Sequence, residues 1–193
     1  DIDSLNEKLF AVLDDEQGKK MEEAVLIAKS EKDSVGGILE TAITGVPAGI
    51  GEPYFDSIES QLAHMLFSIP AVKGVEFGSG FDFAKMRGSE ANDSFRIDEN
   101  GRIFTETNHN GGINGGISNG MPITFRCAIK PTPSISIEQE TVDFVKGENK
   151  NFAVTGRHDP AIIHRARVVI DSAAAIVLCD ILAQRYGTDY LAQ

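Results

Sequence analysis

Residues 123–130 carry the pattern that most limits how this chain can fold. Apolar residues alternate there with polar or small ones: Ile123, Phe125, Cys127 and Ile129 are interleaved with Thr124, Arg126, Ala128 and Lys130. Successive side chains of a β-strand point to opposite faces, so this alternation predicts a strand that is buried on one face. Other elements of the chain must therefore pack against that apolar face and shield it from water.

Three segments have the apolar spacing of helices that can provide this cover. The clearest runs from Phe55 to Ile69, where apolar residues recur every three or four positions and Pro70 ends the pattern. A long helix is predicted from Pro160 onward, and another within the first 33 residues. The apolar positions that define these two helices are Ile163, Ala166, Val169, Ala173, Val177 and Ile181, and Met21, Ala24, Val25 and Ala28, respectively.

Further strands are predicted between and beyond these helices. A β-like run covers residues 35–46, with Leu39, Thr41 and Ile43 on one side. Residues 72–77 predict a short strand, and residues 135–154 predict two more. Strands and long helices in this order predict an α+β fold, in which helices pack on a mainly antiparallel sheet within a single domain of residues 1–193.

The composition is ordinary for a soluble globular protein, with 41% hydrophobic and 24% charged residues. No apolar stretch approaches the ~20 residues that cross a bilayer, so no transmembrane helix is expected. An acidic start, Asp1-Ile2-Asp3, does not resemble a signal peptide. The formal net charge of −11 argues against nucleic acid and against an anionic membrane surface as partners. Cys127 and Cys179 both lie in apolar stretches, which favours buried thiols in a reducing cytosol over a disulfide.

Residues 78–120 contain nine glycines and little periodicity, so we expect a long loop without its own structure and with much mobility. Within it, the segment from Gly111 to Gly120 reads GGINGGISNG. Paired glycines let backbone N–H groups approach a planar or anionic ligand closely, but a plain flexible loop has the same composition. The segment lacks the Gly-Lys-Ser/Thr of a P-loop and the strand–helix setting of a dinucleotide fingerprint.

Two further segments carry candidate binding chemistry. In Lys130-Pro131-Thr132-Pro133-Ser134 the prolines stiffen the turn, which either presents an ammonium and two hydroxyls to a polar ligand or is a Pro-rich strand exit. In Arg157-His158-Asp159-Pro160 the proline suits a first helical position and Asp159 suits its N-cap. A helix N-terminus also favours anions, so Arg157 is a candidate for holding a phosphate there.

Neither a metal site nor a nucleophile triad is indicated, because the four His and two Cys lack the short intervals of zinc ligands. We expect His64, beside the apolar stripe of its helix, to pack or to form a hydrogen bond rather than to act in catalysis. His109 lies in the glycine-rich loop, where nothing in its neighbours decides its role.

Read together, six motifs resemble the chorismate synthase family, in the family's order and over roughly residues 34–175. Besides the three segments described above, they are residues 45–53 (GVPAGIGEP), 68–76 (SIPAVKGVE) and 88–93 (GSEAND). The resemblance implies a β-α-β sandwich with two related halves per subunit, of which this chain is the C-terminal one. It also implies a cytoplasmic homotetramer of the shikimate pathway to aromatic amino acids.

The resemblance implies a reaction and a cofactor as well. The family converts 5-enolpyruvylshikimate 3-phosphate to chorismate and phosphate by an anti 1,4-elimination. Reduced FMN is required although no net redox change occurs. Whether the parent enzyme reduces its own flavin with NADPH is left open by the sequence.

Residue by residue, the resemblance implies FMN contacts at Pro70, Ala71, Gly115 and Lys130, Pro131, Thr132, Pro133 and Ser134. Arg157 matches the family arginine that touches both flavin and substrate phosphate. Asp159 matches the aspartate thought to work with flavin N5 in proton abstraction, which would make it a catalytic residue rather than only a cap.

Full-length family members have roughly as much chain again before the point where this one starts. The missing half carries the family's Ser-His segment, its substrate-binding arginines and both of its proposed catalytic histidines. Since no Met precedes Asp1, we expect a shortened chain that is inactive alone and binds FMN weakly. The alternative function is a non-catalytic binding or assembly domain that kept this scaffold, for which Lys130, Arg157 and Asp159 would not be needed together.

Overall fold

The computed structural model describes residues 5, 8, 10–156 and 158–189. The chain divides into two compact units. The first, here called the α2 unit, contains residues 1–37 and 129–166. The second, the sheet unit, contains residues 38–128 and 167–193.

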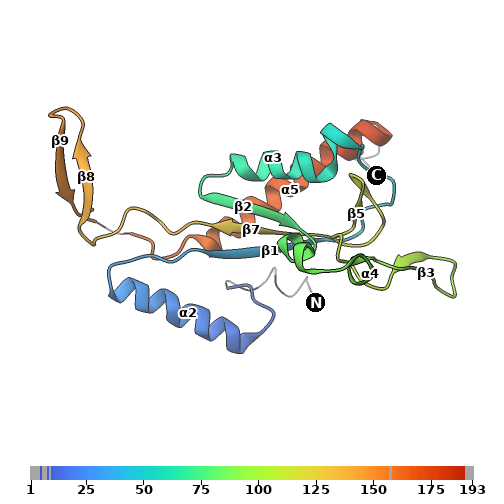
Figure 1. The fold of residues 1–193 in the computed structure, drawn as a ribbon, viewed down its shortest axis with the longest axis horizontal. Helices are drawn as coiled ribbons and strands as arrows, with labels where there is room; N and C mark the ends of the chain where they lie inside the picture. The colour runs from blue at the N-terminus through green and yellow to red at the C-terminus, as the bar shows by residue number, and fades with distance from the viewer. Residues whose placement is uncertain (1–4, 6–7, 9, 157, 190–193) are drawn as a thin grey trace. The chain divides into compact units, whose positions relative to one another are not determined.

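The sheet unit is built on three strands in the spatial order β1-β7-β2 (Figure 1). Their bounds are Gly37–Ile43 for β1, Ile123–Ile129 for β7 and Val72–Phe77 for β2. Gly78 donates its N–H to the carbonyl of Thr124 at 3.0 Å, and a Cβ on Gly74 would lie 3.3 Å from that of Ala128. These two contacts make β2 antiparallel to β7. The predicted α+β fold with an antiparallel sheet is therefore confirmed.

β7 is the central strand and confirms the predicted alternation. Its buried residues Ile123, Phe125, Cys127 and Ile129 are no more than 4% exposed. The ring of Phe125 meets that of Phe77 on β2, with centroids 6.0 Å apart and planes tilted by 49°. The same alternation appears on β1, where Leu39, Thr41 and Ile43 are the more buried set, as predicted.

Two helices supply the apolar cover. α3 (Ile58–Ser68) begins after Ser57, whose Oγ accepts from the N–H of Ser60 at 3.1 Å as an N-cap, and it lies beside β2 (Figure 1). Its buried residues Ile58, Leu62 and Leu66 are fully inaccessible. Each such burial stabilises the fold by about 1.5–3 kcal/mol. α5 (Ile163–Tyr186) buries Ile170, Ala173, Ala174, Val177, Leu178 and Ile181.

Both predicted helix starts were a few residues too early. Tyr54–Asp56 form a separate 3₁₀ turn, η1, and the ring of Phe55 is 93% exposed instead of starting the apolar stripe. α5 begins at Ile163, three residues after Pro160, so Asp159 is not its N-cap. The apolar spacing locates the helix axis well, but the local hydrogen bonds decide where the first turn closes.

The expectation that residues 78–120 lack structure of their own was wrong. The segment forms six short elements: η2 (Gly80–Lys85), α4 (Gly88–Ala91), β3 (Phe95–Ile97), β4 (Ile103–Thr105), β5 (Ile113–Asn114) and β6 (Ile117–Ser118). Asp98 shows how such elements form without apolar periodicity, because its carboxylate accepts from the N–H groups of Asn100 and Arg102 and so makes the β3–β4 turn.

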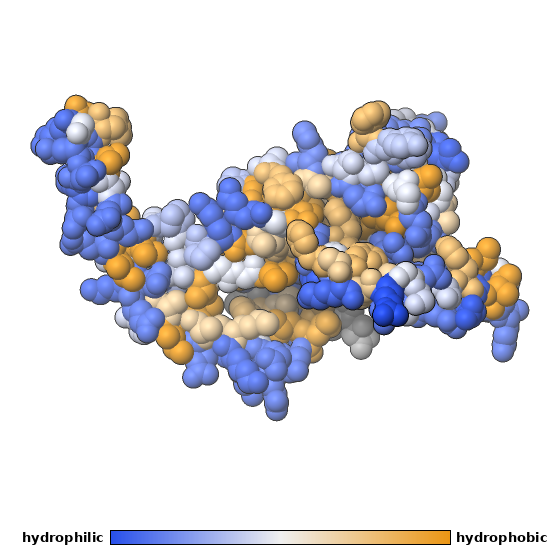
Figure 2. All heavy atoms as spheres, in the orientation of Figure 1, coloured by the Kyte–Doolittle hydropathy of each residue, from blue (hydrophilic) through white to orange (hydrophobic). Residues whose placement is uncertain are grey.

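The α2 unit contains the predicted N-terminal helix and both predicted late strands. α2 (Asp15–Ser30) is capped by Asp14, whose carboxylate accepts from the N–H of Glu16 at 2.8 Å. Of its predicted apolar face only Ala28 is buried, and Met21 is 50% exposed. β8 (Gln139–Asp143) and β9 (Glu148–Phe152) form an antiparallel hairpin. This hairpin exposes Val142, Phe144, Val145 and Phe152 (Figure 2).

None of the helices within the described residues combines the length and apolar character needed to cross a membrane. Both cysteines are free thiols, but only Cys127 is buried. The prediction that Cys179 is buried was wrong, because this position lies on the exposed side of α5.

The two thiols should differ in reactivity. Burial raises the pKa of Cys127 to about 11, so almost no thiolate forms at pH 8, and the strand shields the sulfur. We expect one thiol per chain to react with Ellman's reagent under native conditions and two in urea. Cys179→Ser should abolish the native reaction, whereas a native reaction that persists in this variant would contradict the buried position of Cys127.

Candidate functional site

The GGINGGISNG segment forms a tight hairpin. β5 and β6 pair antiparallel, with Ile113 opposite Ser118 and Asn114 opposite Ile117. Gly115 and Gly116 form the two-residue turn between them, and both have positive φ, +60° and +89°. Two successive positive φ values are typical of a type I′ hairpin turn, which favours glycine at both positions. The glycine pair is therefore a shaped turn, and the plain flexible loop is ruled out.

The two turn glycines have opposite surroundings. The carbonyl of Gly116 accepts from the N–H of Ile58 at 3.1 Å. A Cβ on Gly116 would lie 2.5 Å from the carbonyl oxygen of Glu52 and 2.7 Å from the Cβ of Ser57. A Cβ on Gly115 would meet no atom of the described residues within 4 Å. Gly116 thus docks the hairpin against the start of α3, while the backbone of Gly115 faces open space.

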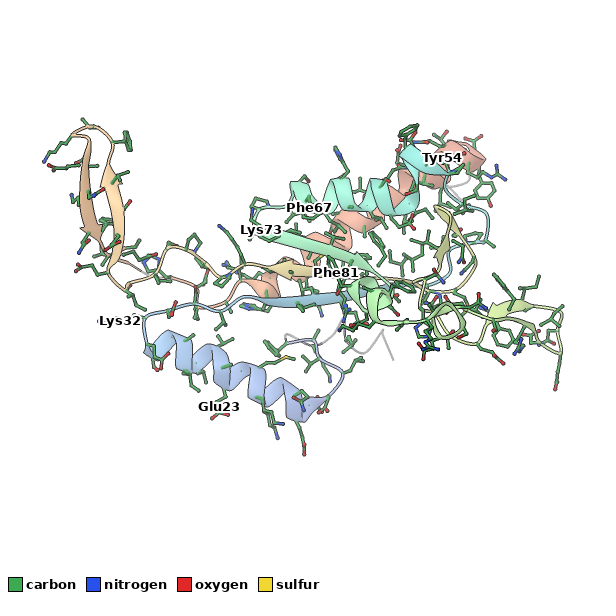
Figure 3. The ribbon with its side chains drawn as sticks, in the orientation of Figure 1. Glu23, Lys32, Tyr54, Phe67, Lys73 and Phe81 are labelled. Atoms are coloured by element: carbon green, nitrogen blue, oxygen red, sulfur yellow. The ribbon has the colours of Figure 1, made fainter. Side chains whose placement is uncertain are left out.

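Gly115 borders a cavity of about 640 Å³ at the start of α3. Its lining residues are Pro53, Tyr54, Ser57, Glu59, Gly115 and Gly116. Tyr54 adopts a positive φ of +64° and presents an 86% exposed ring there (Figure 3). Among the described residues, the buried Oε2 of Glu59 has no hydrogen-bond partner. The cavity is therefore lined by glycine backbone and an aromatic residue, beside a buried carboxylate oxygen.

The other two predicted contacts in the sheet unit lie elsewhere. Pro70 and Ala71 follow the C-cap Ile69 of α3, whereas Gly115 adjoins the residues that begin this helix. Eleven helical residues span about 16 Å, so the structure does not bring Pro70 and Gly115 together. Ala71 has a φ of +77°, a left-handed conformation that costs a non-glycine residue about 1–2 kcal/mol.

The sequence interpretation did not single out Asp93, a buried carboxylate that is 5% exposed. Oδ1 accepts from the hydroxyl of Thr107 at 2.7 Å and the N–H of His109 at 2.8 Å. Oδ2 accepts from the backbone and side-chain N–H groups of Asn110, both at 2.8 Å. Burial acts to raise the pKa of Asp93, but these hydrogen bonds outweigh it and hold the pKa below the ordinary value of 3.8. The GSEAND motif contained this residue, but nothing in its pattern indicated four donors.

In the α2 unit, residues 34–37 join the KPTPS and GRHDP segments. The Ser34 hydroxyl donates to the carbonyl of Thr132 at 2.7 Å, and the next residue, Val35, donates its N–H to the carbonyl of Pro160 at 2.8 Å. A Cβ on Gly36 would clash with the carbonyl oxygen of Ile129 and lie 3.0 Å from Cδ of Pro131, and a Cβ on Gly37 would clash with the end of the Ile163 side chain. The two motifs are therefore held on either side of one stretch of backbone.

Asp159 is placed beside this stretch, and its carboxylate pairs with Arg165 on the first turn of α5. Arg157, the predicted phosphate ligand, lies outside the described residues. Two side-chain atoms in the same motifs, Oγ1 of Thr132 and Nε2 of His158, are buried and have no hydrogen-bond partner within the described part of the chain. A buried polar atom without a partner is costly, so both sites favour a ligand or ordered water.

The isolated histidines have simple surroundings. His64 is exposed on α3, so of the two roles expected for it, packing is not supported. His109 is part-buried, and its Nδ1 lies 3.0 Å from the hydroxyl of Ser79. Asp93 binds the backbone of His109 and not its ring, so Ser79, His109 and Asp93 do not form a nucleophile triad.

The segments whose geometry is described above also occur in known proteins. Residues 1–183 match the chorismate synthase family. The chain belongs to this family. Chorismate synthase from Lachnoclostridium phytofermentans is 59% identical over 150 residues, covering 78% of this chain and 41% of the relative. The enzyme from Methanobrevibacter smithii is 54% identical over 165 residues, covering 86% and 45%.

A crystal structure of chorismate synthase superimposes with a TM-score of 0.72 at 31% identity, covering 90% of this chain and 45% of that one. The chain thus spans about half the length of the chorismate synthases that it matches. The sequence matches and the structural match thus name the same family.

The turn glycines provide a matched pair of variants. Gly115→Ala should lower the free energy of unfolding by about 1–2 kcal/mol, from the positive φ alone. Gly116→Ala adds the overlap with Glu52 and Ser57, which costs about 1–3 kcal/mol more. Urea denaturation of both variants measures the difference. Equal losses would show that Gly116 is not held against α3.

Asp93 should make stability depend on pH. Its folded pKa lies below 3.8, so its contribution is complete above that pH and is lost as the pH falls through the folded pKa. We expect Asp93→Asn to lower the free energy of unfolding by about 3 kcal/mol at pH 7. The difference in this free energy between the variant and the unsubstituted chain should become smaller below pH 3.8. Asp98→Asn, in an exposed turn, is the control with a smaller loss. A gap that stays constant down to pH 2 would be incompatible with an ionised Asp93.

Proposed function

We propose that residues 1–193 form the C-terminal portion of a chorismate synthase, an enzyme that converts 5-enolpyruvylshikimate 3-phosphate to chorismate and phosphate. The observation that carries this proposal is the family match over residues 1–183. Because the matched relatives are about twice as long, the complete activity requires residues beyond those present here. The alternative of a non-catalytic assembly domain is not favoured by relatives that are named as the enzyme.

The proposed reaction is an anti 1,4-elimination that balances without net oxidation. The C–O bond to phosphate breaks with its electron pair, and a proton leaves the carbon at the far end of the existing C=C bond. That bond becomes single as a double bond forms on each side of it, which gives a conjugated diene. When bound, reduced FMN supplies electron density transiently to the breaking C–O bond. The protein's share is to hold the reactants, exclude water and receive the proton.

The residues present fit a flavin. The backbone at Gly115 leaves room for a planar ring, since within the part of the chain that the structure describes no atom beyond its chain neighbours lies within 4 Å of the position a Cβ would take. The buried Oγ1 of Thr132 lacks a partner, as expected of a group that a ligand satisfies. We propose FMN contacts within each unit by itself: Pro70, Ala71 and Gly115 in the sheet unit, the first two and the third at opposite ends of α3, and Lys130 to Ser134 and Arg157 in the α2 unit. The exposed ammonium of Lys130 is available to an anionic group.

For Asp159 we propose the role of a proton acceptor in catalysis, and for Arg157 contact with the substrate phosphate. The carboxylate of Asp159 is 46% exposed and is therefore accessible to a reacting group. Its ion pair with Arg165 fixes the direction of that carboxylate. Arg165 would then act as a positioning residue, since it touches Asp159 and need not touch a ligand.

The remaining properties of the proposed enzyme follow the family resemblance. They are a cytoplasmic location, assembly as a homotetramer, and a place in the shikimate pathway to aromatic amino acids. A phosphorylated small molecule is the proposed partner. NADPH enters only if the complete enzyme reduces its own flavin.

A direct test uses two proteins: the 193-residue chain, and this chain joined to the part of L. phytofermentans chorismate synthase that it does not match. Chorismate formation with reduced FMN is the measurement. We expect activity from the joined protein and none from the chain alone. Turnover by the chain alone would contradict the proposal that this portion is insufficient, and no activity in either would contradict the proposed function.

In the joined protein, Asp159→Asn should leave the fold intact and lower kcat by at least ~100-fold, because the amide cannot accept the proton. Asp180→Asn is the control, since it changes another exposed carboxylate that pairs with a neighbour, Gln184. Circular dichroism checks the fold of both variants. An Asp159→Asn enzyme with unchanged kcat would remove Asp159 from the mechanism.

A further inference from the structure

Asp93 forms hydrogen bonds to the residues that immediately precede the Gly111–Gly120 segment. Its four partners are all donors, two on each carboxylate oxygen. Only a carboxylate satisfies such a set. An amide in the same place would point an NH₂ group at two of the donors and leave them without an acceptor.

The partners of Asp93 fix one turn, from Thr107 to Asn110. The turn is held from its other side by Ser79, which donates its N–H to the carbonyl of His109 at 2.7 Å. Contact between the Ser79 hydroxyl and the His109 ring adds a second link. With both sides held, the turn has one position relative to the strand end at Gly78.

The chain leaves this turn directly into the segment that bears Gly115. Gly111, with a φ of +61°, fits so tightly that a Cβ would lie 2.6 Å from the nitrogen of Gly78. Its carbonyl accepts from the N–H of Thr124 at 3.2 Å. One residue on, the carbonyl of Gly112 accepts from Asn119 at 2.9 Å, which closes the base of the β5–β6 hairpin.

We propose that Asp93 is a positioning residue of the flavin site. Its carboxylate fixes the turn at residues 107–110, the turn fixes the base of the β5–β6 hairpin, and the hairpin presents Gly115 to the cofactor. Asp93 itself touches no ligand. This inference rests on the proposed function, because it takes FMN as the group that Gly115 contacts.

The test measures the Kd for FMN by fluorescence titration in the joined protein described above. Asp93→Asn should raise the Kd at least tenfold. Glu106→Gln is the matched control, because it removes an exposed carboxylate near the same turn that pairs with Arg96, and it should leave the Kd within twofold. A merely structural role would lower the fraction of protein that binds FMN and leave the Kd of that fraction unchanged.

Thr107→Val is the second variant for this titration, and it is used if Asp93→Asn does not fold. It removes one of the four donors and keeps the side-chain shape, so it should raise the Kd about threefold with full binding stoichiometry. If Asp93→Asn folds and its Kd for FMN is unchanged, the positioning role of Asp93 is overturned while the proposed function stands. If Asp93→Asn does not fold, an unchanged Kd in Thr107→Val has the same consequence. A parent protein that binds no FMN overturns the proposed function as well.

Discussion

The pairing of β7 with strands on both of its sides is the constraint on which the rest of the sheet unit depends. One face of this strand places four apolar residues in the core. Its first residues also serve the glycine-rich segment, because Thr124 binds Gly78 through its carbonyl and Gly111 through its N–H. Its far end leads directly into Lys130 and the proline-stiffened turn. A single strand thus couples the apolar core to two of the three segments proposed for the flavin.

Periodic apolar patterns predicted the larger elements well. β2 has the bounds that the sequence indicates, β7 ends one residue earlier than predicted, and the hairpin of β8 and β9 lies within the predicted residues 135–154. Burial on one face produces these patterns, so they can be read without knowledge of distant contacts. The starts of α3 and α5 could not be read in the same way, because Ser57 and Ile162 fix them through local hydrogen bonds.

The short helices and strands between residues 78 and 120 could not be predicted from apolar periodicity, for a physical reason. Its order depends on polar groups that meet across long sequence separations, such as Asp93 with Asn110 and Ser79 with His109. Such pairings leave no period in the sequence. The candidate residues themselves came from resemblance to a family, and the structure adds what the resemblance lacked: an accessible Gly115, a docked Gly116, and the link from Ser34 and Val35 to both remaining motifs.

The β8–β9 hairpin has a different kind of consequence. The described residues give it two strands and no third, and an isolated pair of strands is marginally stable in water. Its opening need not disturb the core around β7, so it forms a local unfolding unit with its own, smaller free energy. Backbone amide hydrogens of residues 139–152 would then exchange with solvent through that local opening. Those of β7 exchange only when the whole sheet opens, and therefore orders of magnitude more slowly.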